Sequence, residues 1–312
     1  MTNYQAKRET WYAARHTAHR ALSAPVLDIF AGHGWGTACQ VLGIDEIGIE
    51  IDRRACETRR NAGMHTVQGD TRDFDPREWM GVEGLIASPP CQDFSVGGLR
   101  KGLDGERGKL VFEAMRYAEA IRPRWILFEQ VPQVYDIFVS FAIRLRELGY
   151  HARVDTVRCE TLGMPTVRKR VILSAHRDRL VRALDPTHSR FHPHSPQRMD
   201  AGMLPFVSMR EALDLPAGGT IGTRRSPDSK SRRAADYRST DYPSVAITRF
   251  ASSWEVRDPG EQRGRLIQVP ELALLQSYPA SFPFAGPRRD QILQVANSVP
   301  PALAERLIQN LL

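Results

Sequence analysis

The feature that most constrains this chain is an apolar run that leads directly into closely spaced glycines. Residues 25–30 read P-V-L-D-I-F, and A-G-H-G-W-G-T follows, with glycines at 32, 34 and 36. Glycines after a first strand let the backbone turn sharply and approach a ligand at the N-terminus of the next helix. The pattern is typical of the first strand and turn of an α/β sheet that binds a nucleotide-like cofactor.

Further short apolar runs alternate with helical patterns as far as residue 175. The runs predict strands at 46–50, 85–87, 125–128 and 171–174. The stretches 108–121 and 136–148 carry apolar residues at helical spacing, and we expect Asp136 to be the N-cap of the second. This alternation predicts a doubly wound, Rossmann-like α/β sheet.

The chain changes character after residue 180. Residues 185–245 contain seven of the 21 prolines and show little periodicity, which favours a domain boundary near 180. Helical spacing returns at the C-terminus, where Pro301 is expected to start a helix. We therefore expect a basic N-terminal extension, a catalytic and cofactor-binding domain, a second, smaller domain and a return to the catalytic domain, at 1–24, 25–180, 181–270 and 271–312.

Composition excludes several classes of protein. The chain has 312 residues, 42% of them hydrophobic and 25% charged, which is ordinary for a soluble globular protein. No apolar run approaches the roughly 20 residues that cross a bilayer. The four cysteines form no C-x-x-C pair, which excludes a zinc ribbon and disfavours a disulfide scaffold. A reducing, cytoplasmic location is expected.

The net charge of +7 is unevenly distributed. Residues 1–24 carry four basic residues and one acidic residue, and residues 181–270 carry fourteen and ten, whereas the rest is balanced. Two basic segments favour a polyanionic partner, because Lys and Arg displace counterions from phosphates. A genome that favours arginine codons would give the same excess, so charge alone leaves both interpretations open.

One acidic residue ends the second predicted strand, and another lies in the turn at residues 69–71. Glu50 lies 18 residues after Gly32, where a carboxylate reaches the ribose hydroxyls of a cofactor. Asp70, in G-D-T, could accept a hydrogen bond from an adenine amino group. A tight structural turn with solvated acids is the alternative. The spacing G-x-G-x-G, rather than G-x-G-x-x-G, argues against NAD and leaves S-adenosylmethionine as the better candidate.

Chemically active side chains follow the later strands. P-P-C-Q-D-F-S (89–95) places Cys91 at the carboxyl edge of the sheet, and E-Q-V-P brings Glu129 to the same edge. T-V-R-K-R contributes Arg168 and Arg170 on one face of a strand. A lone cysteine is more often a buried apolar group, but a proline-flanked cysteine at a strand end favours nucleophilic catalysis.

Taken in order, these motifs resemble those of cytosine-C5 DNA methyltransferases of the bacterial and phage type. The resemblance rests on D-I-F-A-G-x-G, the strand end at Glu50, P-P-C-Q-x-F-S, E-x-V, R-K-R after G-M-P, L-L-Q-S-Y-P-x-x-F (274–282) and A-N-S-V-P-P (296–301). It covers nearly the whole of residues 28–301. The P-P-C-Q motif followed by the others is highly specific.

The resemblance implies methyl transfer from S-adenosylmethionine to C5 of a cytosine that is flipped out of duplex DNA. Cys91 would add to C6, and Glu129 would hydrogen-bond N3 and the exocyclic amine. Arg168 would hold the base carbonyl oxygen, with Arg170 in support. The residues expected to line the cofactor pocket are Phe30, Gly32, Gly34, Glu50, Ile51, Asp70, Thr71, Pro90, Leu110 and Asn297.

The resemblance also makes residues 181–270 a target-recognition domain and residues 97–109 a loop that closes over the flipped base. The candidate DNA contacts are Gln92, Ser95, Arg100, Lys101, Arg224, Arg225, Arg232, Arg233, Arg238 and Arg249. For any one arginine, a solvated loop is the alternative. We expect a double-stranded DNA partner, no metal, no membrane association and a monomer in a bacterial cell or phage-infected host.

Four residues depart from the usual family pattern. Gln130 replaces the asparagine of E-N-V, Thr166 replaces the glutamine of Q-x-R-x-R, Ala296 replaces a glycine, and Asp93 replaces a small residue or proline. These changes bear on the rate and on whether the methyl donor is ordinary S-adenosylmethionine. An RNA cytosine-C5 methyltransferase and a catalytically silent DNA-binding relative remain the alternatives.

Overall fold

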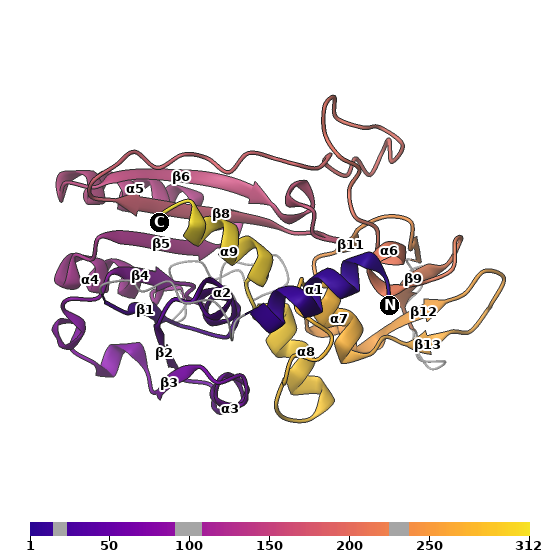
Figure 1. Cartoon of the computed structure of the whole chain (residues 1–312), viewed down its shortest axis with the longest axis horizontal. Helices are drawn as coiled ribbons and strands as arrows, with labels where there is room; N and C mark the ends of the chain where they lie inside the picture. The colour runs from indigo at the N-terminus through magenta and orange to yellow at the C-terminus, as the bar shows by residue number, and fades with distance from the viewer. Residues whose placement is uncertain (15–23, 91–107, 225–236) are drawn as a thin grey trace. The chain divides into compact units, whose positions relative to one another are not determined.

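The computed structural model describes residues 1–14, 24–90, 108–224 and 237–312, and these fall into two compact units (Figure 1). The seven-strand unit comprises Ala14–Val157, Lys169–Asp185 and Leu303–Leu312. The four-strand unit comprises Met1–Ala13, Arg158–Arg168 and Pro186–Ala302.

The seven-strand unit is built on one mixed sheet. Its strands, in the order β3-β2-β1-β4-β5-β8-β6, are β3 (His65–Gln68), β2 (Glu46–Glu50), β1 (Val26–Ile29), β4 (Gly84–Ala87), β5 (Trp125–Gln130), β8 (Lys169–His176) and β6 (His151–Arg158). Neighbouring strands from β3 to β5 are parallel, and β8 runs antiparallel to β5. The doubly wound α/β sheet predicted from the sequence is confirmed.

Complete burial explains the central strands. Every residue of β1, β4 and β5 is buried, as expected for strands that are covered on both faces and read as continuous apolar runs. The described helices of the seven-strand unit are α2 (Gly34–Leu42), α3 (Arg53–Asn61), α4 (Val111–Ile121), α5 (Tyr135–Glu147) and, from Leu303 onwards, α9 (Pro301–Gln309). The core joins Ile126 and Phe128 of β5 to Phe138 and Leu145 of α5.

One helix start was predicted wrongly. Asp136 is not the N-cap of α5, because a 3₁₀ turn over Pro132–Val134 leads directly into the helix and Val134 takes the cap position. Asp136 lies in the first helical turn instead, where a negative charge still interacts favourably with the helix dipole. The predicted helix start at Pro301 is confirmed by α9 (Pro301–Gln309).

The strand order sets the position of the site. The chain passes from β1 to β2 and β3 on one side and then returns to β4 on the other side of β1. Ligands of doubly wound sheets bind at the carboxyl ends of the strands, where this reversal occurs. The loops after β1, β2 and β4 therefore meet at the edge expected for a cofactor.

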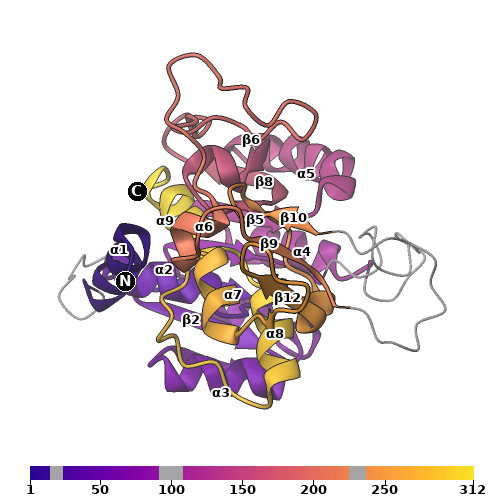
Figure 2. The same ribbon diagram turned by 90° about the vertical axis from the view of Figure 1, so that its right-hand side faces the viewer.

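The four-strand unit holds two small sheets and short helices. The larger sheet has the order β10-β9-β12-β13, with β9, β10 and β12 visible side by side in Figure 2, and the smaller sheet pairs β11 with β7. The strands are β7 (Thr166–Val167), β9 (Thr220–Thr223), β10 (Arg238–Ser239), β11 (Ser244–Val245), β12 (Trp254–Arg257) and β13 (Arg265–Leu266). The helices are α1 (Asn3–Ala13), α6 (Met209–Leu213), α7 (Val269–Leu275) and α8 (Arg288–Asn297).

The N-terminal helix α1 belongs to the core of this unit. Tyr4 is buried, and its hydroxyl donates to the Leu274 carbonyl at 3.3 Å. Glu9 accepts a hydrogen bond from the Ser281 hydroxyl at 2.6 Å. The first half of the basic extension is therefore a packed helix.

The two units divide the chain at other positions than the sequence suggested. Residues 1–13 and 158–168 join the four-strand unit, which then runs from Pro186 to Ala302. The difference arises because contacts far apart in sequence decide a compact unit, whereas composition shifts mark only where a loop-rich stretch begins.

None of the described helices is long and apolar enough to span a membrane.

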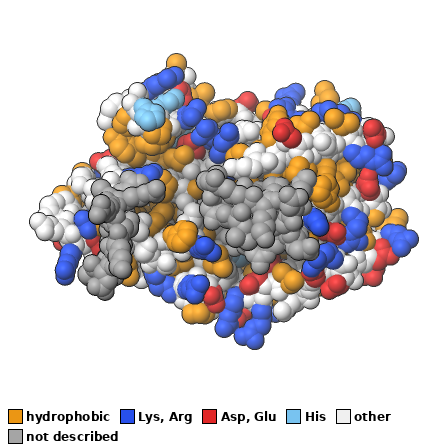
Figure 3. Space-filling view, turned by 180° about the vertical axis from the view of Figure 1, so that it is seen from behind, with side chains coloured by type: hydrophobic (Ala, Val, Ile, Leu, Met, Phe, Trp, Pro, Cys, Tyr) orange, Lys and Arg blue, Asp and Glu red, His pale blue; other side chains and the backbone are white. Residues whose placement is uncertain are grey.

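On the face drawn in Figure 3, apart from the grey segments, basic and acidic side chains are interspersed. The excess positive charge is therefore not gathered into one field on the visible part of that face.

Candidate functional site

The loop after β1 has an unusual backbone conformation. Phe30 has a φ of 57° and Gly32 a φ of 50°, and α2 begins two residues later at Gly34. The left-handed region is costly for a bulky residue such as phenylalanine, and such strain is common at ligand sites. A Cβ added at Gly32 would meet no atom within 4 Å. The loop therefore combines a strained backbone with open space beside it.

Glu50 ends β2 and contacts this loop. Its Oε2 accepts from the Gly32 backbone N–H at 2.9 Å, and its Oε1 accepts from the Asp52 N–H at 2.8 Å. Burial raises the pKa of Glu50, and the two backbone hydrogen bonds partly offset that rise. Each carboxylate oxygen keeps a second lone pair, so the two oxygens of Glu50 can accept hydrogen bonds from two ribose hydroxyls. The next residue, Ile51, is 61% exposed and adds an apolar surface beside the carboxylate.

Asp70 follows β3, and its carboxylate already has a partner. It accepts from the Arg72 backbone N–H at 2.9 Å and from Arg72 Nη2 at 2.6 Å. The hydrogen bonds from Arg72 lower the pKa of Asp70, so the group is ionised at neutral pH. An adenine amino group would have to share this carboxylate with Arg72. The neighbouring Thr71 has a buried hydroxyl with no hydrogen-bond partner among the described residues.

These groups fit the adenosine part of S-adenosylmethionine. The acid at the end of β2, the exposed apolar residue beside it and the unpartnered hydroxyl after β3 supply acceptors and an apolar face at one sheet edge. Pro90 and Leu110 border the segment 91–107, and Leu110 is the N-cap of α4. The remaining expected cofactor residue, Asn297, lies at the end of α8 in the four-strand unit.

Most of the expected catalytic loop lies outside the described residues. Four of the candidate DNA contacts of the sequence analysis and the candidate nucleophile fall in the segment 91–107: Cys91, Gln92, Ser95, Arg100 and Lys101. The same holds for nearly all of the expected closing loop, residues 97–109.

Glu129, near the end of β5, forms an ion pair with Arg170 of β8. The antiparallel register sets Glu129 opposite Ile172, so Arg170, two residues away, shares its face. Arg170 Nε lies 2.8 Å from Glu129 Oε1, and the two side chains are 13% and 8% exposed. The oxygen nevertheless accepts no well-oriented hydrogen bond from the described residues. Among the described residues, this buried carboxylate is therefore held by the charge of Arg170 rather than by a complete set of hydrogen bonds.

Gln130, the next residue, connects β5 to the turn that precedes Cys91. Its Nε2 donates to the Pro89 carbonyl at 2.7 Å, and its Oε1 accepts from the Val131 N–H at 2.6 Å. The side chain is buried. Gln130, which replaces the usual family asparagine, therefore holds the backbone two residues before the candidate nucleophile.

Arg168 belongs to the four-strand unit, and its guanidinium is committed there. Nη1 donates to the Ala296 carbonyl at 3.2 Å, and Nη2 donates to the Ser298 carbonyl at 3.0 Å. The residue is 3% exposed. Arg168 thus holds the backbone on both sides of Asn297, whereas Arg170 contacts the buried carboxylate. These contacts favour a division of roles opposite to the one that the family resemblance implied.

The arginines expected to contact DNA are partly described. Arg225, Arg232 and Arg233 lie in the segment 225–236, outside the described residues, and Arg238 is exposed on β10. The Arg249 guanidinium lies 4.9 Å from the ring centroid of Phe250, which is 57% exposed.

A cluster around Glu255 was not recognised from the sequence. Glu255, on β12, is 2% exposed, and its Oε1 accepts from Arg257 Nε at 2.6 Å and from the Tyr237 hydroxyl at 3.2 Å. Arg224 Nε lies 3.4 Å from Oε2. The Arg257 guanidinium stacks on Tyr237 at 3.7 Å.

Strand alternation would have placed Glu255 outward, because its neighbours Trp254 and Val256 are apolar. All three are buried instead, and no local signal in the sequence indicates this.

Among the residues that the structure describes, no group of His, Cys, Asp or Glu side chains is arranged to hold a metal ion.

The fold and the arrangement of strand ends are those of an S-adenosylmethionine-dependent methyltransferase. A family model described as C-5 cytosine-specific DNA methylase matches residues 25–312. The chain belongs to this family. It is a DNA cytosine-5 methyltransferase with S-adenosylmethionine as its methyl donor, as the sequence motifs predicted.

Similar proteins extend over nearly the whole chain. The Type II methyltransferase M1.HphI of Haemophilus parahaemolyticus is 26% identical and covers 93% of this chain and 87% of its own length. The Type II methylase M.HgiDII of Herpetosiphon aurantiacus is 27% identical, with coverages of 92% and 94%. Among solved structures, the Dnmt2 methyltransferase of S. pombe has a TM-score of 0.65 at 16% identity, with coverages of 92% and 98%. The family and fold predicted from the sequence are confirmed, and the RNA-modifying alternative is not favoured.

Proposed function

We propose that this methyltransferase modifies double-stranded DNA as a monomer, with Cys91 as nucleophile and with Glu129 and Arg170 as the groups that bind the flipped cytosine. One observation carries the assignment: a buried carboxylate at the carboxyl edge of the sheet, paired with an arginine, has an oxygen that accepts no well-oriented hydrogen bond from the described residues. Buried polar groups are normally satisfied, and an exception is a candidate for function.

The proposed chemistry begins with addition of the Cys91 thiolate to C6 of the cytosine. The new S–C6 bond shifts the ring electrons towards C5, which becomes nucleophilic. Carrying a proton, the Glu129 carboxyl group donates to N3 with one oxygen and accepts from the exocyclic amine with the other, which stabilises the charge that the addition creates. Arg170, adjacent to this carboxylate, supplies positive charge for the base carbonyl oxygen, while Arg168 supports the backbone around Asn297.

Bound S-adenosylmethionine supplies the methyl group that C5 takes up. The C5 proton then leaves to a base, the S–C6 bond breaks, and the electron pair returns to the sulfur of Cys91 as the ring regains its double bond. Gln130 contributes by fixing the Pro89 carbonyl, which precedes the nucleophile in the chain.

We assign the cofactor contacts to the residues at the ends of β1, β2 and β3 and to the segments bordering the catalytic loop. These are Phe30, Gly32, Gly34, Glu50, Ile51, Asp70, Thr71, Pro90 and Leu110. We add Asn297, at the end of α8, on the family resemblance alone. The support comes from the strained loop and from the Glu50 carboxylate, whose two oxygens each accept from a backbone N–H. It also comes from the Thr71 hydroxyl, which has no hydrogen-bond partner among the described residues.

The four-strand unit is the proposed target-recognition unit. Arg224 and Arg257 both meet the buried Glu255 carboxylate, which orients their guanidiniums on the sheet β10-β9-β12-β13. Oriented arginines suit bidentate contacts to phosphates or guanine edges. Because relatives are named Type II methyltransferases, we further propose that the enzyme belongs to a restriction–modification system and acts in the bacterial cytoplasm.

The decisive experiment measures transfer of labelled methyl from S-adenosylmethionine to mixed-sequence duplex DNA by the wild type and by Cys91→Ala. Label above the mutant background is expected, and its absence would overturn the proposal. Duplex DNA containing 5-fluorocytosine should trap a covalent complex with the wild type. Methylation without such a complex would exclude addition of Cys91 to C6. Size-exclusion chromatography tests the monomer.

The assignment of the two arginines has its own test. Arg170→Lys should lower kcat, because an ammonium group cannot reproduce the position of the guanidinium beside Glu129, with little change in the free energy of unfolding. Arg168→Lys should instead lower stability, because two buried carbonyls lose donors. Single-turnover rates and urea unfolding of both variants measure this, and the reverse pattern would restore the roles that the family resemblance implied.

A further inference from the structure

A second acid–arginine pair in the seven-strand unit lies beneath the glycine loop. Arg59 of α3 reaches Glu46, the first residue of β2, and its Nη2 lies 2.8 Å from both carboxylate oxygens. The Arg59 side chain is 0% exposed and that of Glu46 is 4% exposed. A buried ion pair often stabilises a protein no more than apolar residues of similar size would. A contribution to stability therefore does not by itself explain why this chain has the Arg59–Glu46 pair.

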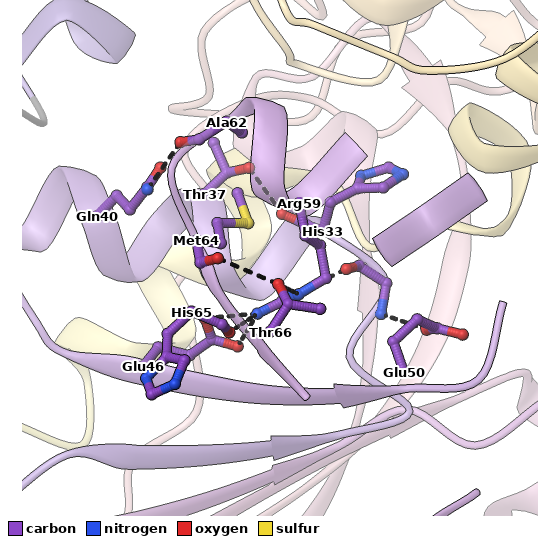
Figure 4. A network of polar contacts seen from close by, with 11 residues as sticks. His33, Thr37, Gln40, Glu46, Glu50, Arg59, Ala62, Met64, His65 and Thr66 are labelled. Atoms are coloured by element: carbon purple, nitrogen blue, oxygen red, sulfur yellow. Dashed lines mark hydrogen bonds and ion pairs between the residues drawn. The ribbon is translucent and has the colours of Figure 1, made fainter. Parts of the chain in front are cut away.

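The remaining nitrogens of Arg59 are also bonded (Figure 4). Nε donates to Thr66 Oγ1 at 3.1 Å, and Nη2 also donates to the His65 carbonyl at 3.0 Å. Nη1 donates to the Gly32 carbonyl at 3.0 Å. One side chain therefore joins α3, β2, β3 and the loop after β1.

Two glycines make room for this guanidinium. A Cβ added at Gly48 would lie 2.1 Å from Arg59 Nη2, and a Cβ at Gly36 would lie 3.0 Å from Glu46 Oε2. The third glycine of the G-x-G-x-G run thus serves the ion pair, although the sequence suggested a close approach to a cofactor. The surroundings are built around an arginine at position 59.

The contact to Gly32 connects the pair to the cofactor site. The Gly32 carbonyl accepts from Arg59, and the Gly32 N–H donates to Glu50, which is the proposed ribose acceptor. Gly32 has a left-handed backbone conformation, and both of its backbone polar groups are held: the carbonyl by Arg59 and the N–H by Glu50 at the end of β2. Without Arg59, this carbonyl would lose its donor, and Gly32 would keep only the hydrogen bond from its N–H to Glu50.

We propose that Arg59 and Glu46 are positioning residues for S-adenosylmethionine, acting through the Gly32 carbonyl on the glycine loop and on Glu50. This inference rests on the proposed location of the cofactor at that loop. An arginine is required because its planar fork serves the loop carbonyl with one arm and the Glu46 carboxylate with the other, which a single ammonium group cannot do in the same geometry.

The test uses the double variant Glu46→Met/Arg59→Met in the full-length enzyme. Replacing both partners by apolar residues leaves no unpaired buried charge, so the protein should remain folded. The Kd of S-adenosylmethionine, measured by calorimetry without DNA, should rise at least about tenfold, with the KM of the same compound rising in parallel. The kcat at saturating S-adenosylmethionine and the KM of DNA should change less than about threefold, since uniform binding is lost rather than transition-state binding.

A matched control removes an ion pair away from the loop. Arg144 and Glu119 form a pair at 2.6 Å with side chains 52% and 41% exposed, and Glu119→Met/Arg144→Met should bind S-adenosylmethionine like the wild type. Urea unfolding of each variant separates stability from affinity. A folded Glu46→Met/Arg59→Met enzyme with the wild-type Kd would overturn the inference.

Should the double variant not fold, Arg59→Lys carries the test. It keeps the positive charge opposite Glu46 but cannot also serve Gly32, so the Kd should rise about threefold or more while kcat is retained. An unchanged Kd would overturn the inference. If the wild type itself does not bind S-adenosylmethionine, the proposed function fails instead, so the two failures are distinguishable.

Discussion

The two buried acid–arginine pairs of the seven-strand unit use the same chemistry to different degrees of completion. The Arg59 guanidinium is wholly enclosed, and all three of its nitrogens donate to acceptors in the surrounding elements. The Glu129–Arg170 pair is also buried, but Glu129 Oε1 accepts no well-oriented hydrogen bond from the described residues. A completed network rigidifies what it touches, whereas an incomplete one retains capacity for a ligand. The Arg59–Glu46 pair therefore supports the glycine loop, whereas the Glu129–Arg170 pair is the candidate binding group.

Among the variants of these pairs, Glu129→Ala is expected to have the largest effect. If the incomplete pair binds the base, the rate of methyl transfer should fall by about 10²–10⁴-fold, the usual contribution of a positioned acid–base group. Single-turnover transfer to duplex DNA measures it, with Glu129→Gln as the isosteric control. A near wild-type rate for Glu129→Ala would show that the Glu129 carboxylate has no part in the chemistry.

Glu46→Ala should produce the opposite result, a loss of stability. Removing one partner strands the enclosed Arg59 charge, which is expected to lower the free energy of unfolding by about 3–5 kcal/mol. Urea unfolding without cofactor measures the change. Glu119→Ala, which removes one member of the exposed pair with Arg144, should lower the free energy by less than about 1 kcal/mol. Equal losses in the two variants would contradict the distinction.

The completed pair also has a pH-dependent neighbour. Burial, followed by repulsion from Glu46, raises the pKa of Asp28 well above its ordinary value, and Arg59 offsets this only in part. The native state therefore keeps a proton that the unfolded chain releases above about pH 4. Stability should fall as the pH rises from there towards the raised native pKa.

Asp28→Asn removes this titration and should flatten the dependence of the free energy of unfolding on pH between about 4, the ordinary pKa of an aspartate, and the raised native pKa. The asparagine variant should consequently gain stability relative to the wild type as the pH increases. Urea unfolding at several pH values measures the slopes. Parallel slopes for the two proteins would mean that Asp28 is ionised in the native state.

The Glu255 cluster extends the comparison to the four-strand unit with the smallest expected effect. There the carboxylate is enclosed at 3% exposure, whereas the Arg224 side chain is 53% exposed. Arg224→Ala should weaken DNA binding by about 1 kcal/mol and reduce the slope of log K against log salt by about one. Arg144→Ala, at an exposed position of α5 in the seven-strand unit, is the control. An unchanged salt dependence for Arg224→Ala would exclude a phosphate contact.

Much of the site was predictable because its signals are local. The apolar runs and the glycines predicted β1, β2, β4, β5 and the later strand β8. They also placed Glu50 and Glu129 at strand ends. Strand β6 (His151–Arg158) was missed, because H-A-R-V-D-T-V-R has too few apolar residues to be recognised as a strand without its neighbour β8.

The partners of the charged residues were not predictable in the same way. The Asp70 carboxylate was expected to accept a hydrogen bond from an adenine amino group, but Arg72, two residues away, already donates to it. Arg168 and Arg170 look equivalent in T-V-R-K-R, yet one bonds carbonyls near residue 297 and the other meets Glu129. Alternation predicts a shared face, but it does not say which buried acceptor each guanidinium reaches.

Sequence alone was enough to predict the family, the strand–turn–helix order and the residues at the strand ends, because glycine turns and apolar periodicity depend on near neighbours in the chain. The three-dimensional fold was needed to show that Arg59 is enclosed, that Gly36 and Gly48 make room for its ion pair, and that α1 belongs to the four-strand core. Burial of a charge depends on groups from several distant elements at once, and no window of sequence contains them all.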